Sequence, residues 1–216
     1  MISCIIAVLN GEKTIEKTIQ SFLRQTGDKE MLVIDSGTDR TEEICRKYPI
    51  SYHRVPFVGQ FEKINYGIEI MKGDTFVIMG HDDQLIDEAF ERVRREKQDW
   101  VYGDMLLLDE KGEEIGQEIL ETYSQERYWQ KNIIPIVTSF VRKDCLKGLR
   151  FNQSYPINAD YDFFLRLSQK IQPRQIHHFL TKYMIRPDSE YRKNIPKANK
   201  DREIIRSELK KELCIN

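Results

Sequence analysis

Two adjacent carboxylates, Asp82 and Asp83, are the residues in this chain that point most directly to chemistry. They follow a glycine and an unbroken apolar run at residues 76–79. A run of this kind, without polar alternation, is typical of a strand buried on both faces of a parallel sheet, and its carboxyl end lies at the edge where open α/β folds bind ligands. Two neighbouring carboxylates repel each other, so the pair predicts a positive partner, most simply a divalent cation. The alternative is that one of them caps a helix that begins near Ile86.

Two further acids stand at the ends of predicted elements. Asp35 follows an apolar run at residues 31–34, and Asp160 stands at the start of a strongly apolar helix. In a parallel sheet Asp35 shares one edge with the acid pair, where it could accept hydrogen bonds from a base or ribose while a metal neutralises a diphosphate. This arrangement predicts a nucleotide ligand. Two plainer alternatives stay open: Asp35 forms only a turn with Ser36 and Gly37, and Asp160 only caps its helix.

The surrounding pattern predicts an α/β fold. Strands are expected at residues 2–9, 31–34, 50–55 and 76–79, with helical patterns between them and another at 86–97. This alternation is typical of a parallel sheet with right-handed crossovers. After residue 99 the pattern changes, and two apolar stretches flank Glu110-Lys111-Gly112 as in a β-hairpin. We therefore expect a mostly parallel central sheet flanked by helices, with a small antiparallel part in the second half.

Length and composition limit the class of protein. The chain has 216 residues, 40% of them hydrophobic and 32% charged, which suits one domain or one domain with an extension. A formal net charge of −1 argues against a dedicated nucleic-acid binder. No apolar stretch is long enough to span a bilayer and no basic segment precedes an apolar one at the N-terminus, so we expect a cytosolic protein. Four scattered cysteines favour reduced thiols over disulfides or a zinc site.

The tail is basic, with twelve lysines and arginines against six acids from residue 170 onward. Residues 196–213 predict an amphipathic helix with Ile204, Ile205, Leu209 and Leu213 on one face. The first interpretation is a terminal helix docked on its own domain. The second is peripheral contact with anionic lipid at the inner face of the plasma membrane, since the polar face is basic.

Several stretches together resemble a known family. They resemble the inverting glycosyltransferases of family 2, whose fold is called GT-A, and especially the short bacterial enzymes of polysaccharide assembly. The stretches follow the family's order and approximate spacing and cover most of residues 1–170. They read SCIIAVLNGEKTIEKTIQSFLRQT, MLVIDSGTDRTEEI, NYGIEIMKGDTFVIMGHDD, VYGD and ADYDFFLRL. The resemblance implies a GT-A domain at residues 1–185, with a nucleotide-binding half (1–103) and an acceptor-side half (104–185), followed by a basic helical extension at 186–216.

The resemblance also assigns roles to individual residues. Asp82 and Asp83 match the metal-binding acidic motif, with Asp83 the better candidate to coordinate Mg²⁺ or Mn²⁺ directly and Asp82 also a nucleotide contact. Asp160 matches the general base, and Asp104 matches a segment near the donor sugar. The remaining matches contact the nucleotide: the base through Leu9, Asn10, Glu12 and Asp35, and the diphosphate and ribose through Asn65 and Gly67.

These roles imply transfer of a sugar from a nucleotide-sugar donor, UDP being the family's commonest nucleotide, to a hydroxyl of a glycan or lipid-linked acceptor in cell-surface polysaccharide synthesis. A hydroxyl is a poor nucleophile, so a carboxylate must take its proton as it attacks. Asp160 suits this task if partial burial raises its pKa. Asp162 points away on a helix and is expected to be structural. Arg166 also matches the family, although it could simply pair with Asp162 at the surface.

Some features depart from the family or leave a role open. His81, Ile136 and Ala159 stand where relatives more often carry a small polar residue, a histidine and a glutamate, which bears on sugar and acceptor specificity. His177 and His178 lie in a predicted strand near a position where some relatives place another metal ligand, and at most one of two adjacent strand residues could reach it.

The main rival is a non-catalytic nucleotide-sugar-binding module. A pyrophosphorylase would need a glycine-rich loop after the first strand, and Asn10-Gly11-Glu12-Lys13 does not supply one. A receiver domain would carry its acid pair after the first strand instead of a later one. The sequence is compatible with a homodimer and does not decide it.

Overall fold

The protein is described here by a computed structural model that covers residues 1–186 and 193–214. Four parallel strands form the first half of the sheet in the order β3-β2-β1-β4. Their bounds are Ile2–Val8 for β1, Lys29–Asp35 for β2, Ser51–Arg54 for β3 and Thr75–Met79 for β4. All four were predicted from the sequence, and β1, β2 and β4 were predicted from apolar runs. In register, Val8 pairs with Asp35 and Ile6 with Met79, so the carboxyl ends meet at one edge.

The second half of the sheet contains the antiparallel pairs. Strand β8 (Ser139–Arg142) runs antiparallel between β4 and β6 (Trp100–Leu108), β6 pairs in parallel with β9 (Arg174–Met184), and β5 (Gln84–Leu85) pairs antiparallel with β9. The predicted hairpin is formed by β6 and β7 (Glu114–Glu118), with Gly112 in the turn at a φ of +88°. The fold class expected from the sequence is confirmed.

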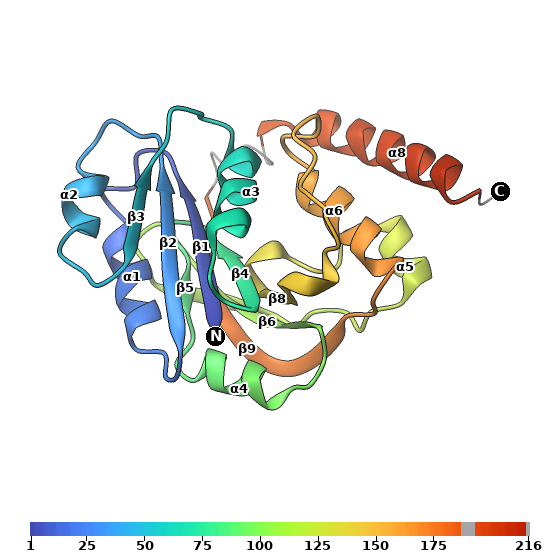
Figure 1. Ribbon diagram of the computed structural model, residues 1–216. Coiled ribbons are helices and arrows are strands. Elements are labelled where there is room, and N and C mark those ends of the chain that lie inside the picture. Colours follow the sequence, from blue (N-terminus) through green and yellow to red (C-terminus); the bar gives the residue numbers. More distant parts are fainter. Residues whose placement is uncertain (187–192, 215–216) are drawn as a thin grey trace.

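Helices cover both faces of this sheet (Figure 1). The helices are α1 (Ile15–Leu23), α2 (Thr41–Cys45), α3 (Gln60–Ile70), α4 (Ala89–Arg95), α5 (Gln125–Gln130), α6 (Ala159–Ser168) and α8 (Ile195–Glu212), with 3-10 turns at Ile136–Thr138 and Lys143–Cys145. Because successive strand residues point to opposite faces, β1 serves two cores. Cys4 and Ile6 pack with α1, α2 and α4, whereas Ile5 packs with α3 and α6.

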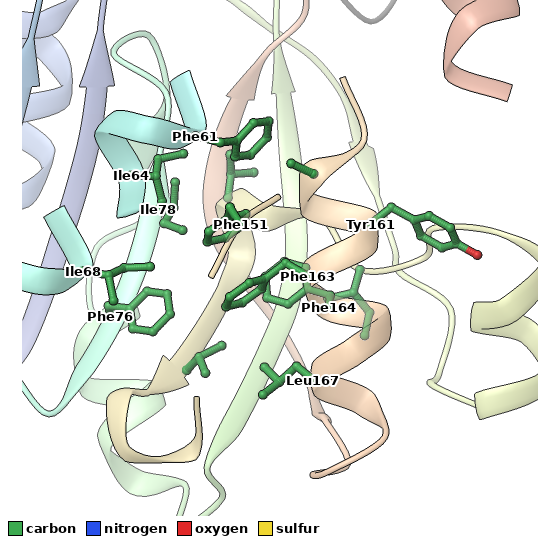
Figure 2. Close-up of a cluster of buried hydrophobic side chains, with 14 of the residues drawn as sticks. Phe61, Ile64, Ile68, Phe76, Ile78, Phe151, Tyr161, Phe163, Phe164 and Leu167 are labelled. Carbon is green, nitrogen blue, oxygen red and sulfur yellow. The ribbon is translucent and has the colours of Figure 1, made fainter. Parts of the chain in front are cut away.

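The core between α3, β4 and α6 is rich in aromatic residues. Figure 2 shows Phe61, Ile64 and Phe76 on one side facing Phe163 and Phe164 of α6. Phe151, from the loop before α6, stacks on Phe163 with ring centroids 3.9 Å apart, and it also stacks on Phe61 at 5.3 Å. These stacks attach α6 to α3, which itself packs on β1 and β2, so the first turn of α6 has a fixed place beside the ends of the strands.

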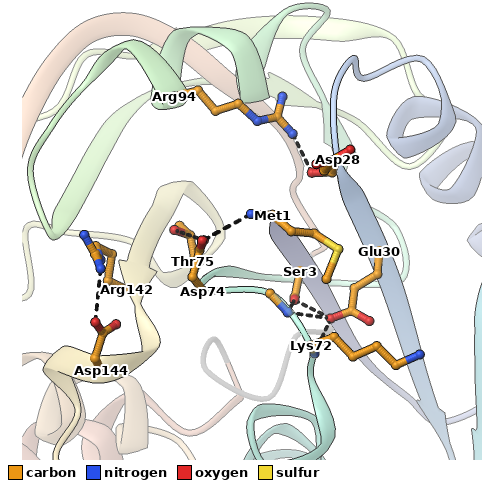
Figure 3. A network of polar contacts seen from close by, with 11 residues as sticks. Met1, Ser3, Asp28, Glu30, Lys72, Asp74, Thr75, Arg94, Arg142 and Asp144 are labelled. Carbon is orange, nitrogen blue, oxygen red and sulfur yellow. Dashed lines mark hydrogen bonds and ion pairs between the residues drawn. The ribbon is translucent and has the colours of Figure 1, made fainter.

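Polar contacts close the opposite, amino-terminal edge of the parallel strands (Figure 3). The Met1 amino group lies 3.3 Å from the Asp74 carboxylate. The Ser3 hydroxyl donates to Glu30 Oε1 at 2.6 Å, and the backbone N–H of Lys72 donates to the same oxygen at 2.6 Å. These bonds join the starts of β1, β2 and β4, while the carboxyl edge carries the cavities described below.

The C-terminal helix α8 docks on the domain itself, which confirms the first interpretation of the tail. Its residues Ala198, Ile205 and Leu209 are buried. Ile204 and Leu213 are 38% and 39% exposed, so the prediction that they share the apolar face was wrong; Ile204 is turned about 100° from Ile205 on a helix. Residues 187–192, at the start of the predicted extension, lie outside the described part. Within that described part, no helix has the length and apolarity needed to cross a membrane.

Candidate active site

Three cavities lie at the carboxyl edge of the parallel strands and share walls. The loop cavity, of about 800 Å³, is lined by the segments that follow β1, β2 and β4, including Asn10, Glu12 and His81. The central cavity, of about 290 Å³, is lined by Asp82, Asp83 and Asp160 among others. The α6 cavity, of about 500 Å³, is lined by Asp160 and by apolar residues that include Ile136 and Ile157. The acid pair and Asp160 therefore face connected space, whereas Asp35 lines none of these three cavities.

Hydrogen bonds tie together the loops around the loop cavity. Asn10 Oδ1 accepts from the Thr38 backbone N–H at 2.8 Å, and the Glu12 N–H donates to Asp39 Oδ2 at 2.8 Å. On the other side of Glu12, His81 Nδ1 lies 2.7 Å from the hydroxyl of Thr14. Of the residues predicted to contact the base, Asn10 and Glu12 reach this cavity; Leu9 precedes them with a side chain that is 52% exposed.

Asp35 lies buried beneath these loops. Its Oδ1 accepts from the Gly37 N–H at 2.7 Å, which forms the turn left open as an alternative, and its Oδ2 accepts from the Tyr52 hydroxyl at 2.8 Å. The nearby Lys63 is also buried and donates to the Val8 carbonyl at 2.5 Å. Burial lowers the pKa of Lys63, and the charge of Asp35 opposes that shift. Asp35 and Lys63 thus fix the ends of β1 and β2.

The two acids of the pair have different surroundings. Asp83 is only 2% exposed and accepts backbone N–H groups from Gly80 at 2.9 Å and Met184 at 3.1 Å. Burial, followed by the neighbouring charge of Asp82, raises the pKa of Asp83 to about 7. Asp82 instead forms an ion pair with Arg186, with Asp82 Oδ2 2.6 Å from Nε. A Cβ at Gly80 would lie 2.6 Å and 2.7 Å from carboxylate oxygens of the pair, so a side chain here would displace these carboxylates.

The helix-cap alternative for the acid pair is wrong. Strand β5 follows the pair directly, and α4 begins only at Ala89. The residue before Ala89 is Glu88, which makes no side-chain capping bond. Asp83 uses its oxygens to join the β4–β5 turn to the end of β9.

Asp160 lies in the first turn of α6 and borders both the central cavity and the α6 cavity. Its Oδ2 accepts from Asn132 Nδ2 at 3.2 Å. Burial raises the pKa of Asp160, as expected, while the bond from Asn132 opposes that shift. Asp162 points away from the cavities, is fully buried and lies 2.8 Å from Arg166 Nε. The structural role of Asp162 is confirmed, but its pairing with Arg166 is not a surface ion pair, because the aspartate is inside the core.

Three other residues that were predicted to contact the nucleotide or the donor sugar make structural interactions. Asn65 clamps the backbone of Phe151 through two bonds of 2.9 Å. Gly67 allows α3 to approach β1, since a Cβ there would lie 2.5 Å from Ile5 Cγ2. Asp104 is 4% exposed and accepts the Leu120 N–H at 2.9 Å. The structure does not bring these three residues together with the acid pair, because each is committed to packing or to a distant segment.

His177 and His178 are both exposed. The β6–β9 pairing shifts register here, with Gly103 opposite Ile176 and Asp104 opposite Phe179, so neither histidine has a partner in the ladder. The expected alternation of strand faces therefore fails at this bulge. The end of β9 at Met184, where the acid pair lies, is about 20 Å along the strand from His178.

Arg186 was missed in the sequence, yet it lines all three cavities. A signal was present: Arg186 directly follows the predicted strand at 174–185, and residues after strand ends were already candidates elsewhere in the chain.

Residues 3–139, which are more than half of the chain, match the family model described as "Glycosyl transferase family 2". The chain belongs to glycosyltransferase family 2.

Relatives of this family 2 chain include a "PGL/p-HBAD biosynthesis glycosyltransferase" from Mycobacterium bovis, 28% identical over 181 residues that cover 77% of this chain and 69% of the relative. An "Uncharacterized glycosyltransferase" from Rickettsia felis is 26% identical over 188 residues, which cover 77% of this chain and 31% of the relative. The chain thus spans less than a third of the Rickettsia protein.

Solved structures confirm the GT-A fold of this family 2 chain. Staphylococcus aureus TarS 1-349 in complex with UDP-GlcNAc superposes with a TM-score of 0.72 at 16% identity, covering 89% of this chain and 60% of that one. The complex of the same protein with UDP gives a TM-score of 0.69 at 16% identity, covering 86% and 61% of the two chains. The family 2 chain therefore spans about three fifths of these two TarS chains.

Proposed function

We propose that this chain is a metal-dependent, inverting glycosyltransferase of the hexosyltransferase type that uses a UDP-sugar donor. The acceptor is a hydroxyl of a glycan or lipid-linked molecule in cell-surface polysaccharide synthesis. The observation that carries the proposal is the single central cavity lined by Asp82, Asp83 and Asp160. The two carboxylates that would hold a cation for a leaving diphosphate and a third carboxylate able to accept a proton line the same space.

The carboxylates fit a Mg²⁺ or Mn²⁺ ion that is shared with the substrate. Each Asp83 oxygen accepts one backbone N–H and keeps a further lone pair, and Asp82 borders the central cavity. Among the described residues, no group of three or more His, Cys, Asp and Glu side chains could form a complete protein cage. A site with only the two carboxylates of Asp82 and Asp83 suits Mg²⁺, which is usually bound by one or two carboxylates, several waters and substrate phosphates. A cation held by Asp82 and Asp83 would stabilise negative charge on the departing diphosphate.

The residues around the cavities divide the remaining tasks. Asn10 and Glu12 line the loop cavity, where the nucleotide would bind. Asp160 would take the proton of the acceptor hydroxyl as its oxygen attacks the anomeric carbon from the side opposite the diphosphate, so one displacement inverts that centre. The raised pKa of Asp160, caused by burial, makes it a stronger base, and Asn132 orients its carboxylate.

The relatives support the donor and the acceptor class. TarS forms complexes with UDP and with UDP-GlcNAc, which favours a UDP-sugar donor here. The name of the Mycobacterium relative refers to PGL/p-HBAD biosynthesis. The α6 cavity has apolar walls that include Ile136, Ile157 and Ile185, which suits an acceptor with an apolar part.

Release of UDP from UDP-sugars tests this proposal. With Mn²⁺ and a panel of UDP-hexoses, Asp160→Asn should lower turnover by about 100- to 10,000-fold while UDP binding is retained. Asp144→Asn, at an exposed carboxylate whose side chain is 68% accessible, is the matched control and should behave as the wild type. Turnover equal to that of the wild type in Asp160→Asn would refute the role of Asp160 as the general base. A wild type that binds UDP-sugars without turnover on any acceptor would instead support the rival binding module.

A further inference from the structure

Arg186 stands at a position that no assigned role explains. The backbone before it is fixed, since the Ile185 N–H donates to the Leu108 carbonyl at 2.9 Å. Its guanidinium Nε lies 2.6 Å from Asp82 Oδ2, and the side chain is 33% exposed. A partly exposed ion pair usually contributes little to stability. The place of this pair, at the junction of the loop, central and α6 cavities, therefore points to a role in binding.

Of the cationic side chains around the cavities, Arg186 is the best placed to bind an anion. Lys13 lines only the loop cavity and Arg202 lines only the α6 cavity, whereas Arg186 borders all three. Arg202 also donates to Asn158 Oδ1 at 3.1 Å and lies over the ring of Tyr161. An arginine can bind two phosphate oxygens at once through its planar group, and it stays charged at any physiological pH.

The acid pair gives Arg186 a second state. When a diphosphate enters beside Asp82, its negative charge competes with Asp82 for the guanidinium. If a divalent cation joins the site, Asp82 is needed as a ligand and no longer needs the arginine. Such an exchange would keep every charge paired, with Arg186 on a phosphate and Asp82 on the cation.

We propose that Arg186 binds the diphosphate of the donor and that its ion pair with Asp82 is the donor-free state of the same group. This inference rests on the proposed function, since it deepens the description of the donor site. It makes Arg186 a determinant of diphosphate affinity that acts even without a metal ion. In metal-free protein, Asp82 then competes weakly with the diphosphate of the nucleotide for the Arg186 guanidinium.

Calorimetric titration of the full chain with UDP and with uridine, in EDTA and in Mn²⁺, tests this proposal. The quantity compared is the ratio of UDP affinity to uridine affinity, because uridine lacks the diphosphate. In EDTA, Arg186→Gln should lower this ratio by at least about tenfold, as expected for loss of a charge-assisted hydrogen bond, and Arg186→Lys should lower it less. Lys13→Gln is the matched control on the loop cavity and should change the ratio less than Arg186→Gln.

Asp82→Asn provides an independent arm. Without the competing carboxylate, the UDP-to-uridine ratio in EDTA should rise above that of the wild type, whereas in Mn²⁺ it should fall because a metal ligand is lost. A purely structural ion pair would lower thermal stability in Arg186→Gln and Asp82→Asn alike and leave the UDP-to-uridine ratio of each variant in EDTA unchanged.

The outcomes separate this inference from the proposed function. If the wild type binds UDP in Mn²⁺ but Arg186→Gln keeps the wild-type ratio, or if Lys13→Gln shows the larger loss, the role of Arg186 is refuted and the proposed function stands. If the wild type binds neither UDP nor uridine under either condition, both fail. Melting curves of Arg186→Gln and of Arg186→Lys, which keeps the charge, verify that the change in affinity does not reflect unfolding.

Discussion

Asp83 and Asp160 line the same cavity although one follows β4 and the other begins α6. The parallel sheet places Asp83 at its carboxyl edge, and the stacked aromatic residues of α6 hold Asp160 beside it. A carboxylate that could hold a cation for a leaving diphosphate and a carboxylate that could accept a proton are thereby held across one small space. The proposed transfer reaction depends on this relationship more than on any single residue.

The activity should depend on pH through Asp160. Burial raises the pKa of Asp160, and a base must be deprotonated, so kcat/KM should fall on acidification at a higher pH than for an ordinary aspartate. The bond from Asn132 opposes the upward shift, so Asn132→Ala should raise the pKa further and move the acidic limb to still higher pH. The measurement is a pH profile of kcat/KM at saturating Mn²⁺.

The Asn132 variant is needed because Asp83 also has a raised pKa, about 7, and could produce an acidic limb by itself. Of these two carboxylates, only Asp160 is hydrogen-bonded to Asn132, so removing Asn132 distinguishes between them. An unchanged limb in Asn132→Ala would contradict the assignment of that limb to Asp160.

Gly67→Ala should destabilise the fold without a direct effect on nucleotide binding. The added Cβ would lie 2.5 Å from Ile5 Cγ2, and overpacking of this kind costs about 1–3 kcal/mol. Urea unfolding measures the loss. Gly116→Ala is the control, since the nearest atom to its added Cβ lies 4.0 Å away. Weaker UDP binding with unchanged stability would instead restore the ligand contact implied by the family resemblance.

Arg166→Ala should destabilise the protein strongly because it leaves the fully buried Asp162 without its cation. Loss of one partner of a buried pair costs about 3–5 kcal/mol. Glu212→Ala removes the exposed acid of α8 that also pairs with Arg166, and it should cost less than about 1 kcal/mol. Chemical denaturation compares the two variants. Equal losses would mean that the contact between α6 and α8, and not the buried charge, sets the stability.

Much of the fold was predictable because a buried parallel strand needs an unbroken apolar run, which is visible locally. The runs that became β1, β2 and β4 predicted the sheet, and the acids after them predicted its functional edge. The separation of Asp160 from Asp162 also followed from helical geometry. These features depend only on the periodicity of the chain.

Other features depend on partners far away in the sequence. Asn65 binds the backbone at Phe151, and Asp104 binds the backbone at Leu120, which no local pattern discloses. A family match assigned both to the ligand, whereas tertiary contacts commit them to the fold. Arg186 could have been found from its position after a strand, but its pairing with Asp82 arises only when β9 is placed in the sheet.

The most direct test of the central claim is the thermal stability of the wild type and of Asp83→Asn with nucleoside diphosphates, with Mn²⁺ or with EDTA. At about 100 times the dissociation constant, UDP with Mn²⁺ should raise Tm by roughly 5–10 °C, well above its effect in EDTA and above that of other bases. Asp83→Asn should lose the increment due to Mn²⁺. Equal shifts for all nucleotides, or the same shift with and without Mn²⁺, would contradict a diphosphate held by a cation at the acid pair.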